Sequence, residues 1–325
     1  MKSRSRVLAL LLAACTAPSS SPPTGSTSSS VVYGEDNRRD VFELDDAPRD
    51  VASRSVVAIF ASGLDESDPS NIRIVAPSLG KALALCPSER FWSEPSAASC
   101  SGTLIADDLV LTAGHCVEPS GSEDEGNTPT EVCRHRRFVF GYYNDAPKRL
   151  RKLRSEDVFS CADVVVQRTP GVRQDAQETS LDFAIVRLDR PATPRFEPIK
   201  LRATGASVTE GRALTVFGFP SGIPLKVADK GTVRAVRREG DYFRGTVDTF
   251  AGNSGSGVFA PDSLEQVGIL VAGEPDYVKR GPCRVVSRCR ETGCGGERSE
   301  RMNRIEPVLE AYCALDNARP ELCGR

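Results

Sequence analysis

The chain has 325 residues, of which 39% are hydrophobic and 26% charged, and its formal net charge at pH 7 is −2. This length allows two core-bearing lobes, and the composition is that of an ordinary globular protein. The nearly balanced charge offers no electrostatic footprint for a polyanion, so we expect no nucleic-acid partner.

The first residues resemble a lipoprotein-type signal peptide over residues 1–14. A basic start precedes the apolar run 7–14, which is too short to cross a bilayer as a helix. Leucine and two alanines then stand directly before Cys15, as in the bacterial lipobox, whose cysteine is acylated. An ordinary signal peptide with a chance cysteine is the alternative. We expect lipidation at Cys15, a membrane attachment through that lipid, and location in the bacterial cell envelope (outer membrane or periplasm) or secretion.

Residues 15–50 form a region of mixed character. Residues 16–30 are dominated by serine, proline and threonine without apolar periodicity, which is typical of a flexible tether. From Val31 to about Asp50 the chain is charged, and it is either a pro-segment or an N-terminal arm of the folded domain. We place the main domain at residues 51–325.

Beyond residue 50 the apolar runs are short and are bounded by Gly, Pro, Asp and Asn. They cover residues 55–60, 103–105, 109–111, 138–143, 163–166, 183–186, 213–217, 231–233, 258–259 and 267–271. None has sustained helical spacing, and this pattern predicts an all-β sandwich or barrel. A helix is predicted only near the end, over residues 304–312, where Pro307 fits a first turn.

Two histidines are present in the whole chain, so histidine chemistry must use His115 or His135. His115 follows the run 109–112 and a glycine, and it precedes Cys116. A disulfide from Cys116 back to Cys100 would fix the ring in the way a general base requires. His135 lies among arginines and looks like part of a surface loop.

A carboxylate and a serine complete a candidate constellation. Asp182 leads the apolar run 183–188 and could accept the second N–H of the histidine. Asp175, in a loop, and Asp189, after the strand, are weaker candidates. Ser254 stands among glycines in residues 252–257, which is either a flexible turn or a nucleophile whose backbone N–H groups stabilise an oxyanion.

These segments resemble the three active-site motifs of the chymotrypsin-like serine peptidases, in the order His, Asp, Ser. The likeness is closest to the bacterial glutamyl-endopeptidase-like branch, which also carries Gly-Asn-Ser-Gly-Ser. The α/β-hydrolases carry their catalytic residues in the order Ser, Asp, His and need the motif Gly-x-Ser-x-Gly. This chain has another order, and Ser256 replaces the second glycine of that motif. The resemblance implies two six-stranded antiparallel β-barrels, over about 51–195 and about 196–302, with a C-terminal helix over about 303–316.

The resemblance also implies roles for individual residues. Ser254 would be the nucleophile, His115 the general base, and Asp182 the orienting acid. The backbone N–H groups of Gly252 and Ser254 would form the oxyanion hole. The chain would then be a serine endopeptidase with a protein or peptide substrate, acting as a monomer without cofactor or metal. A catalytically silent binding module on the same fold is the alternative.

Two departures concern activation and specificity. Asn253 stands where trypsin-like zymogens carry an aspartate for an ion pair with a newly cut N-terminus. That switch should therefore be absent, and chains that begin near Val31 and near Val51 should share one cleft geometry. The strand 268–273 lacks the histidine of the glutamyl-specific branch.

We place the specificity pocket at Asp248, Thr249, Leu270 and Gly273. Asp248 lies six residues before Ser254, at the position of the pocket-floor carboxylate in the trypsin branch. If its side chain faces the pocket, it selects Arg or Lys. If it does not, it is a strand-end aspartate.

The cysteine count predicts one further link. Ten of the eleven cysteines remain after Cys15 is set aside, which indicates a disulfide framework in an oxidising compartment. If Cys100 pairs with Cys116, each half of the chain keeps an odd number. At least one disulfide must then join the halves. Cys283, Cys289 and Cys294 lack the spacing of a metal site.

Overall fold

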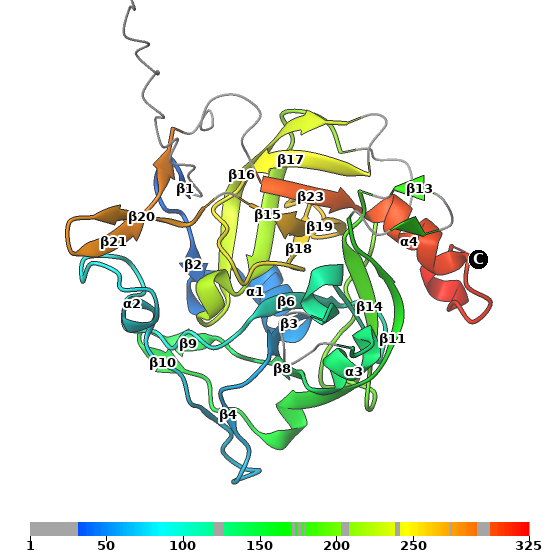
Figure 1. Cartoon of the computed structure of the whole chain (residues 1–325), viewed down its shortest axis with the longest axis horizontal. Coiled ribbons are helices and arrows are strands. Elements are labelled where there is room, and N and C mark those ends of the chain that lie inside the picture. Colours follow the sequence, from blue (N-terminus) through cyan, green and yellow to red (C-terminus); the bar gives the residue numbers. More distant parts are fainter. Residues whose placement is uncertain are drawn as a thin grey trace, which may run out of the picture.

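The computed structural model describes residues 32–119, 126–170, 173–174, 177–178, 180–202, 208–237, 241–273, 275–290 and 300–324. The predicted signal peptide, the tether and the lipidation site at Cys15 lie outside these residues. Two closed barrels of six antiparallel strands make up the described part, which confirms the predicted fold class (Figure 1).

The first barrel has the strand order β11-β14-β7-β6-β3-β8. Its strands are β3 (Val56–Phe60), β6 (Cys100–Leu104), β7 (Leu109–Thr112), β8 (Arg137–Phe140), β11 (Val158–Arg168) and β14 (Phe183–Leu188). All five residues of β3 and all four of β7 are buried, so both strands read as continuous apolar runs. Phe138, Phe140 and Ile185 are among the fully buried side chains at its centre.

The second barrel has the order β15-β18-β19-β23-β17-β16 and closes through pairing of β15 with β16. Its strands are β15 (Ala213–Gly218), β16 (Lys226–Val236), β17 (Tyr242–Thr246), β18 (Gly257–Phe259), β19 (Gln266–Ala272) and β23 (Glu300–Arg304). Its core includes Leu214, Phe243 and Met302. The two barrels share a further cluster in which Tyr142 of the first stacks on Phe219 of the second.

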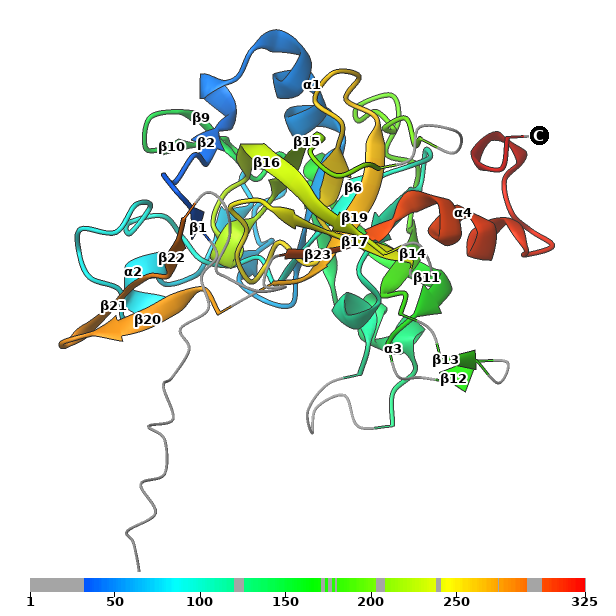
Figure 2. The same ribbon diagram turned by 90° about the horizontal axis from the view of Figure 1, so that it is seen from above.

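Short elements decorate the barrels. The helices are α1 (Asp46–Arg54), α2 (Leu79–Ala82), α3 (Pro129–Arg134) and α4 (Ile305–Cys313). The paired short strands are β4 (Leu64–Asp65) with β5 (Arg73–Ile74), β9 (Asn144–Ala146) with β10 (Arg149–Leu150), β12 (Arg173–Gln174) with β13 (Gln177–Glu178), and β20 (Tyr277–Arg280) with β21 (Cys283–Val286). Helix α4 follows the second barrel but packs its Ile305 and Val308 into the core cluster of the first, beside β11 and β14 (Figures 1 and 2).

Residues 32–54 are packed onto the barrels. Strand β1 (Val32–Tyr33) pairs in parallel with β22 (Arg288–Cys289), and β2 (Arg39–Asp40) pairs with β16 of the second barrel. Val41 and Leu44 enter the cluster shared by the two barrels. We call residues 32–45 the N-terminal arm.

Disulfides brace the described chain at several points. The predicted link between the halves is confirmed, because Cys86 is bonded to Cys283, 197 residues away. The bonded pair Cys100–Cys116 flanks His115, and the other two pairs are Cys133–Cys161 and Cys313–Cys323. The Cys86–Cys283 disulfide ties the β20–β21 hairpin to the segment after α2. The hairpin and this segment lie on the same side of the molecule (Figure 2).

Candidate active site

A tight turn at the end of β7 presents His115. Strand β7 ends at Thr112, and a 3-10 turn over Gly114–Val117 carries the histidine. A Cβ atom on Gly114 would lie 2.1 Å from the carbonyl oxygen of Arg168, so only glycine lets this turn approach β11 so closely. The disulfide of the next residue, Cys116, fixes the turn to β6.

Asp182 lies directly before β14 and is bonded twice to His115. Its Oδ2 lies 2.8 Å from the ring Nδ1, and its Oδ1 accepts the backbone N–H of His115 at 3.0 Å. The aspartate side chain is 6% exposed, whereas that of His115 is 38% exposed. Since Nδ1 is directed at a buried carboxylate, the other ring nitrogen, Nε2, remains for chemistry at the surface.

Asn303 of β23 holds Asp182 from the other barrel. Its Oδ1 accepts the backbone N–H of Asp182 at 2.8 Å, and its Nδ2 donates to the carbonyl oxygens of Ser180 at 3.3 Å and Asp241 at 3.5 Å. Asn303 is completely buried. No local sequence pattern predicted this residue, because it lies 121 residues from Asp182 along the chain.

The Ser254 turn packs against the start of the His115 turn. Gly252 has a φ of 90°, a conformation that glycine adopts without steric cost. A Cβ on Gly255 would lie 2.2 Å from the Oγ1 of Thr112, so the turn lies directly on the end of β7. The Sγ of Cys116 lies 3.7 Å from the carbonyl oxygen of Ser254. These contacts place the turn of Ser254 beside the turn that carries His115.

Ser101 of β6 fixes the same turn from the first barrel. Its backbone N–H donates to the carbonyl oxygen of Ser254 at 2.8 Å, and its Oγ donates to that of Gly252 at 2.7 Å. The N–H groups of Gly252 and Ser254 have no acceptor among the residues that the structure describes. With both carbonyls held from behind, these two donors are available to an oxyanion.

A cavity of about 310 Å³ adjoins Ser254. The residues that line it are Thr249, Phe250, Ala251, Ser254, Leu270, Ala272, Gly273, Asp276 and Glu300. Three of the four residues predicted for the specificity pocket, Thr249, Leu270 and Gly273, therefore line this cavity. Asp248 does not line the cavity: it is 2% exposed, and its two oxygens accept the backbone N–H groups of Tyr33 and Asn37, each at 2.9 Å. Burial raises the pKa of Asp248 to about 6, although both N–H groups act to lower it.

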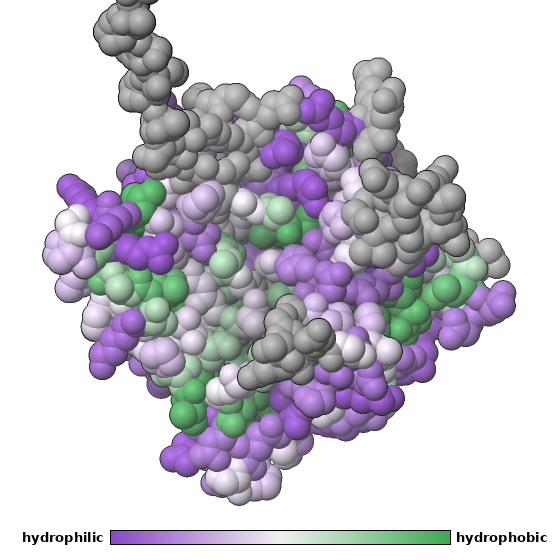
Figure 3. All heavy atoms as spheres, in the orientation of Figure 1, coloured by the Kyte–Doolittle hydropathy of each residue, from purple (hydrophilic) through white to green (hydrophobic). Residues whose placement is uncertain are grey.

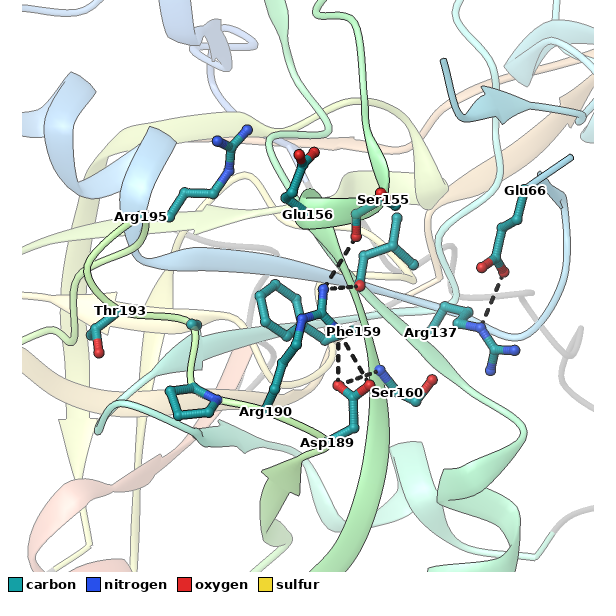
Figure 4. Close-up of a pocket in the computed structure, with 13 residues that line it drawn as sticks. Glu66, Arg137, Ser155, Glu156, Phe159, Ser160, Asp189, Arg190, Thr193 and Arg195 are labelled. Carbon is teal, nitrogen blue, oxygen red and sulfur yellow. Dashed lines mark hydrogen bonds and ion pairs between the residues drawn. The ribbon is translucent and has the colours of Figure 1, made fainter. Parts of the chain in front are cut away.

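Another hollow, of about 540 Å³, lies on the outside of the first barrel (Figure 4). Its arginines pair with carboxylates: Arg190 with Asp189, and Arg137 with Glu66. None of Ser254, His115 and Asp182 lines it, and Asp189 is therefore remote from the histidine. Asp175 lies outside the described side chains. His135 is exposed at the end of α3.

Cys100, His115 and Cys116 also lie close enough together to resemble a metal site. The two sulfur atoms are bonded to each other, so neither is available as a thiolate ligand.

A family profile agrees with this architecture. The profile of the trypsin-like peptidase domain matches residues 100–269, more than half of the chain. Among solved structures, a Glu endopeptidase in complex with MPD is 18% identical, covering 87% of this chain and 99% of its own, with a TM-score of 0.49. Neuropsin, a serine protease expressed in the limbic system of mouse brain, is 14% identical, with 81% and 94% covered and a TM-score of 0.47. No curated protein matches the chain significantly by sequence.

Proposed function

Since this chain belongs to the trypsin-like peptidase family, we propose that it is a serine endopeptidase whose catalytic triad is Ser254, His115 and Asp182. The observation that carries the proposal is the double hydrogen bond of buried Asp182 to His115, at 2.8 and 3.0 Å, beside the serine turn. A non-catalytic domain on the same fold would have no need to hold a half-exposed histidine in this way.

The proposed reaction has two acyl-transfer steps. The Oγ of Ser254 attacks the peptide carbonyl carbon while the Nε2 of His115 takes the hydroxyl proton. The backbone N–H groups of Gly252 and Ser254 stabilise the oxyanion, and the C–N bond breaks as the histidine protonates the leaving amine. A water molecule then attacks the acyl-enzyme and gives its proton to His115. The ester bond to the Oγ of Ser254 breaks, and the histidine returns the proton to that oxygen as the acid product leaves. Asp182 keeps the proton on Nδ1 and stabilises the imidazolium.

Matched variants test this mechanism on a mixed peptide library. We expect Asp182→Asn to lower kcat by about 10⁴-fold, since the asparagine favours the wrong histidine tautomer. Asp189→Asn removes a carboxylate at the other end of β14, outside the site, and it should keep wild-type activity (Figure 4). Equal activity of Asp182→Asn and the wild type would overturn the proposal.

Export is supported by the disulfides, which form in oxidising compartments. No helix in the described ranges is both long and apolar enough to cross a membrane. We propose that an acylated Cys15 supplies the attachment. Labelling of cells with a fatty-acid analogue should mark the wild type and not Cys15→Ser, and labelling of both would contradict the proposal.

We also propose that the chain acts as a monomer without a trypsin-like activation switch. Within the described ranges Val75 is the one large apolar side chain that is strongly exposed, and apolar residues form only small separate groups on the face in Figure 3. Asn253 is 2% exposed, and its Oδ1 accepts a hydrogen bond from Ser256 at 3.2 Å. Its neutral amide cannot form the ion pair of the trypsin-like switch. Sedimentation of the purified chain tests the monomer, and a stable dimer would contradict it.

A further inference from the structure

We infer that Ser221 and Tyr277 are positioning residues for the oxyanion hole, because they fix the peptide group that joins Ala251 to Gly252. This inference rests on the proposed function, in which the backbone N–H of Gly252 stabilises the oxyanion. The carbonyl and the N–H of one planar trans peptide group point in opposite directions. A contact that holds the carbonyl of Ala251 therefore also determines where the N–H of Gly252 points.

Ser221 holds that carbonyl from the neighbouring turn. Its backbone N–H donates to the carbonyl oxygen of Ala251 at 2.5 Å. A Cβ atom on Gly252 would lie 2.9 Å from the nitrogen of Gly222, so the two turns are in direct contact. With the carbonyl of Ala251 directed at Ser221, the N–H of Gly252 faces away from this turn and is available to an oxyanion.

Ser221 itself has a backbone conformation that is unusual for serine. Its φ is 53° and its ψ is 26°, in the left-handed region. A residue other than glycine keeps such a conformation only where its surroundings impose it. The carbonyl oxygen of Ser221 accepts the hydroxyl of Ser96 at 2.7 Å, and its Oγ lies 2.7 Å from the Oη of Tyr277. Ser221 is thus held from the segment before β6 and from the β20–β21 hairpin.

Tyr277 connects this turn to the hairpin. It is the first residue of β20, it is 7% exposed, and its ring centroid lies 5.5 Å from that of Phe250. The preceding residue, Asp276, accepts the backbone N–H of Ala251 at 2.9 Å through its Oδ2. The two backbone polar groups of Ala251 are therefore both held, the N–H by Asp276 and the carbonyl by Ser221. The peptide group that carries the N–H of Gly252 has little freedom to rotate.

Two single variants remove the same hydrogen bond from its two ends. Ser221→Ala and Tyr277→Phe should each lower kcat by about 10-fold with KM nearly unchanged, because the oxyanion forms only after the substrate has bound. The double variant should lose no more than either single variant, since one shared bond is removed. Tyr143→Phe, which changes a tyrosine of the first barrel beside Arg151, is the matched control.

A peptidyl aldehyde distinguishes a positioning role from a general loss of stability. The aldehyde forms a tetrahedral adduct with Ser254, and the oxygen of this adduct occupies the oxyanion hole. Tyr277→Phe should therefore bind the aldehyde about 10-fold more weakly than the wild type. The corresponding peptide amide should bind Ser254→Ala and Ser254→Ala/Tyr277→Phe nearly equally, because its carbonyl carries no full negative charge.

The outcomes separate this inference from the proposed function. Wild-type kcat and wild-type aldehyde affinity in both single variants would overturn the inference and leave a reactive Ser254 intact. A wild-type chain that cleaves no peptide would contradict the proposed function, and crystal structures of the wild type and Tyr277→Phe would then test the inference without catalysis. A rotated carbonyl of Ala251 in the variant would support the inference, and one unchanged orientation would overturn it.

Discussion

Replacing Asn303 by alanine should impair catalysis without touching the reacting groups. Asn303 accepts the N–H of Asp182 at 2.8 Å and donates to two carbonyl oxygens, so the change removes the acceptor of a buried N–H. One unsatisfied buried N–H costs about 1–3 kcal/mol of stability. The larger effect is positional, because Asp182 sets the ring of His115. A shift of about 1 Å in a catalytic group lowers the rate by about 100-fold.

The assay separates these two effects. Thermal unfolding gives the loss of stability, and kcat and KM are measured well below the new Tm. We expect kcat to fall by about 10- to 100-fold with KM nearly unchanged. Asn317→Ala, an exposed site near the C-terminus, controls for the substitution itself. A Tm decrease with wild-type kcat would refute the positioning role of Asn303 and leave it a purely structural residue.

Three further predictions concern the surroundings of the site. A chain that begins at residue 51 should have a lower Tm and at least 10-fold lower kcat/KM than one that begins at residue 32. The shorter chain lacks both N–H groups that bond to buried Asp248. Equal activity of the two chains would favour the sequence-based expectation of one shared cleft geometry. The pair Cys86→Ser and Cys283→Ser should cost about 2–5 kcal/mol and speed proteolysis of the β20–β21 hairpin; unchanged proteolysis would contradict a bracing role. Burial raises the pKa of Asp276 to about 6, against the lowering effect of the Ala251 N–H, Arg38 and Arg284. Ionisation of this carboxyl therefore costs stability as the pH rises from about 4 to about 6, and Asp276→Asn should flatten the fall of Tm over that range.

The arm explains why the first of these effects is expected. Arg38 is 2% exposed, pairs with Asp36, and lies 3.9 Å above the ring of Phe250. Phe250 lines the cavity beside Ser254, and Tyr33 bonds to Glu300 on the same cavity. The arm therefore forms the outer support of the pocket, although its charged sequence resembled a removable segment.

Much of the fold was predictable because apolar runs mark buried strands. The runs 55–60, 109–111, 183–186 and 267–271 all correspond to strands of the two barrels. Strands β17 and β23 were missed. In them Arg244 and Arg301 alternate with buried Phe243 and Met302, so a half-buried barrel strand had the composition of a polar loop.

The residues of the candidate site also differ in how well the sequence predicts them. His115, Asp182 and Ser254 each stand in a local sequence motif at a turn or a strand end, so each could be predicted from the sequence. Asp248 shows the limit of such motifs, because its position along the chain does not determine which way its side chain points. Asn303 and Glu300 reach the site only through the pairing of β23 with β17 and β19, which no local pattern encodes.

Reaction with a peptidyl phosphonate shows whether Ser254 is an activated nucleophile. Mass spectrometry of the full chain should show one adduct per molecule, on the peptide that contains Ser254. The label should be absent from Ser254→Ala and form about 10⁴-fold more slowly in Asp182→Asn. An adduct on another residue, or labelling of Ser254→Ala at the wild-type rate, would show that Ser254 is not the nucleophile.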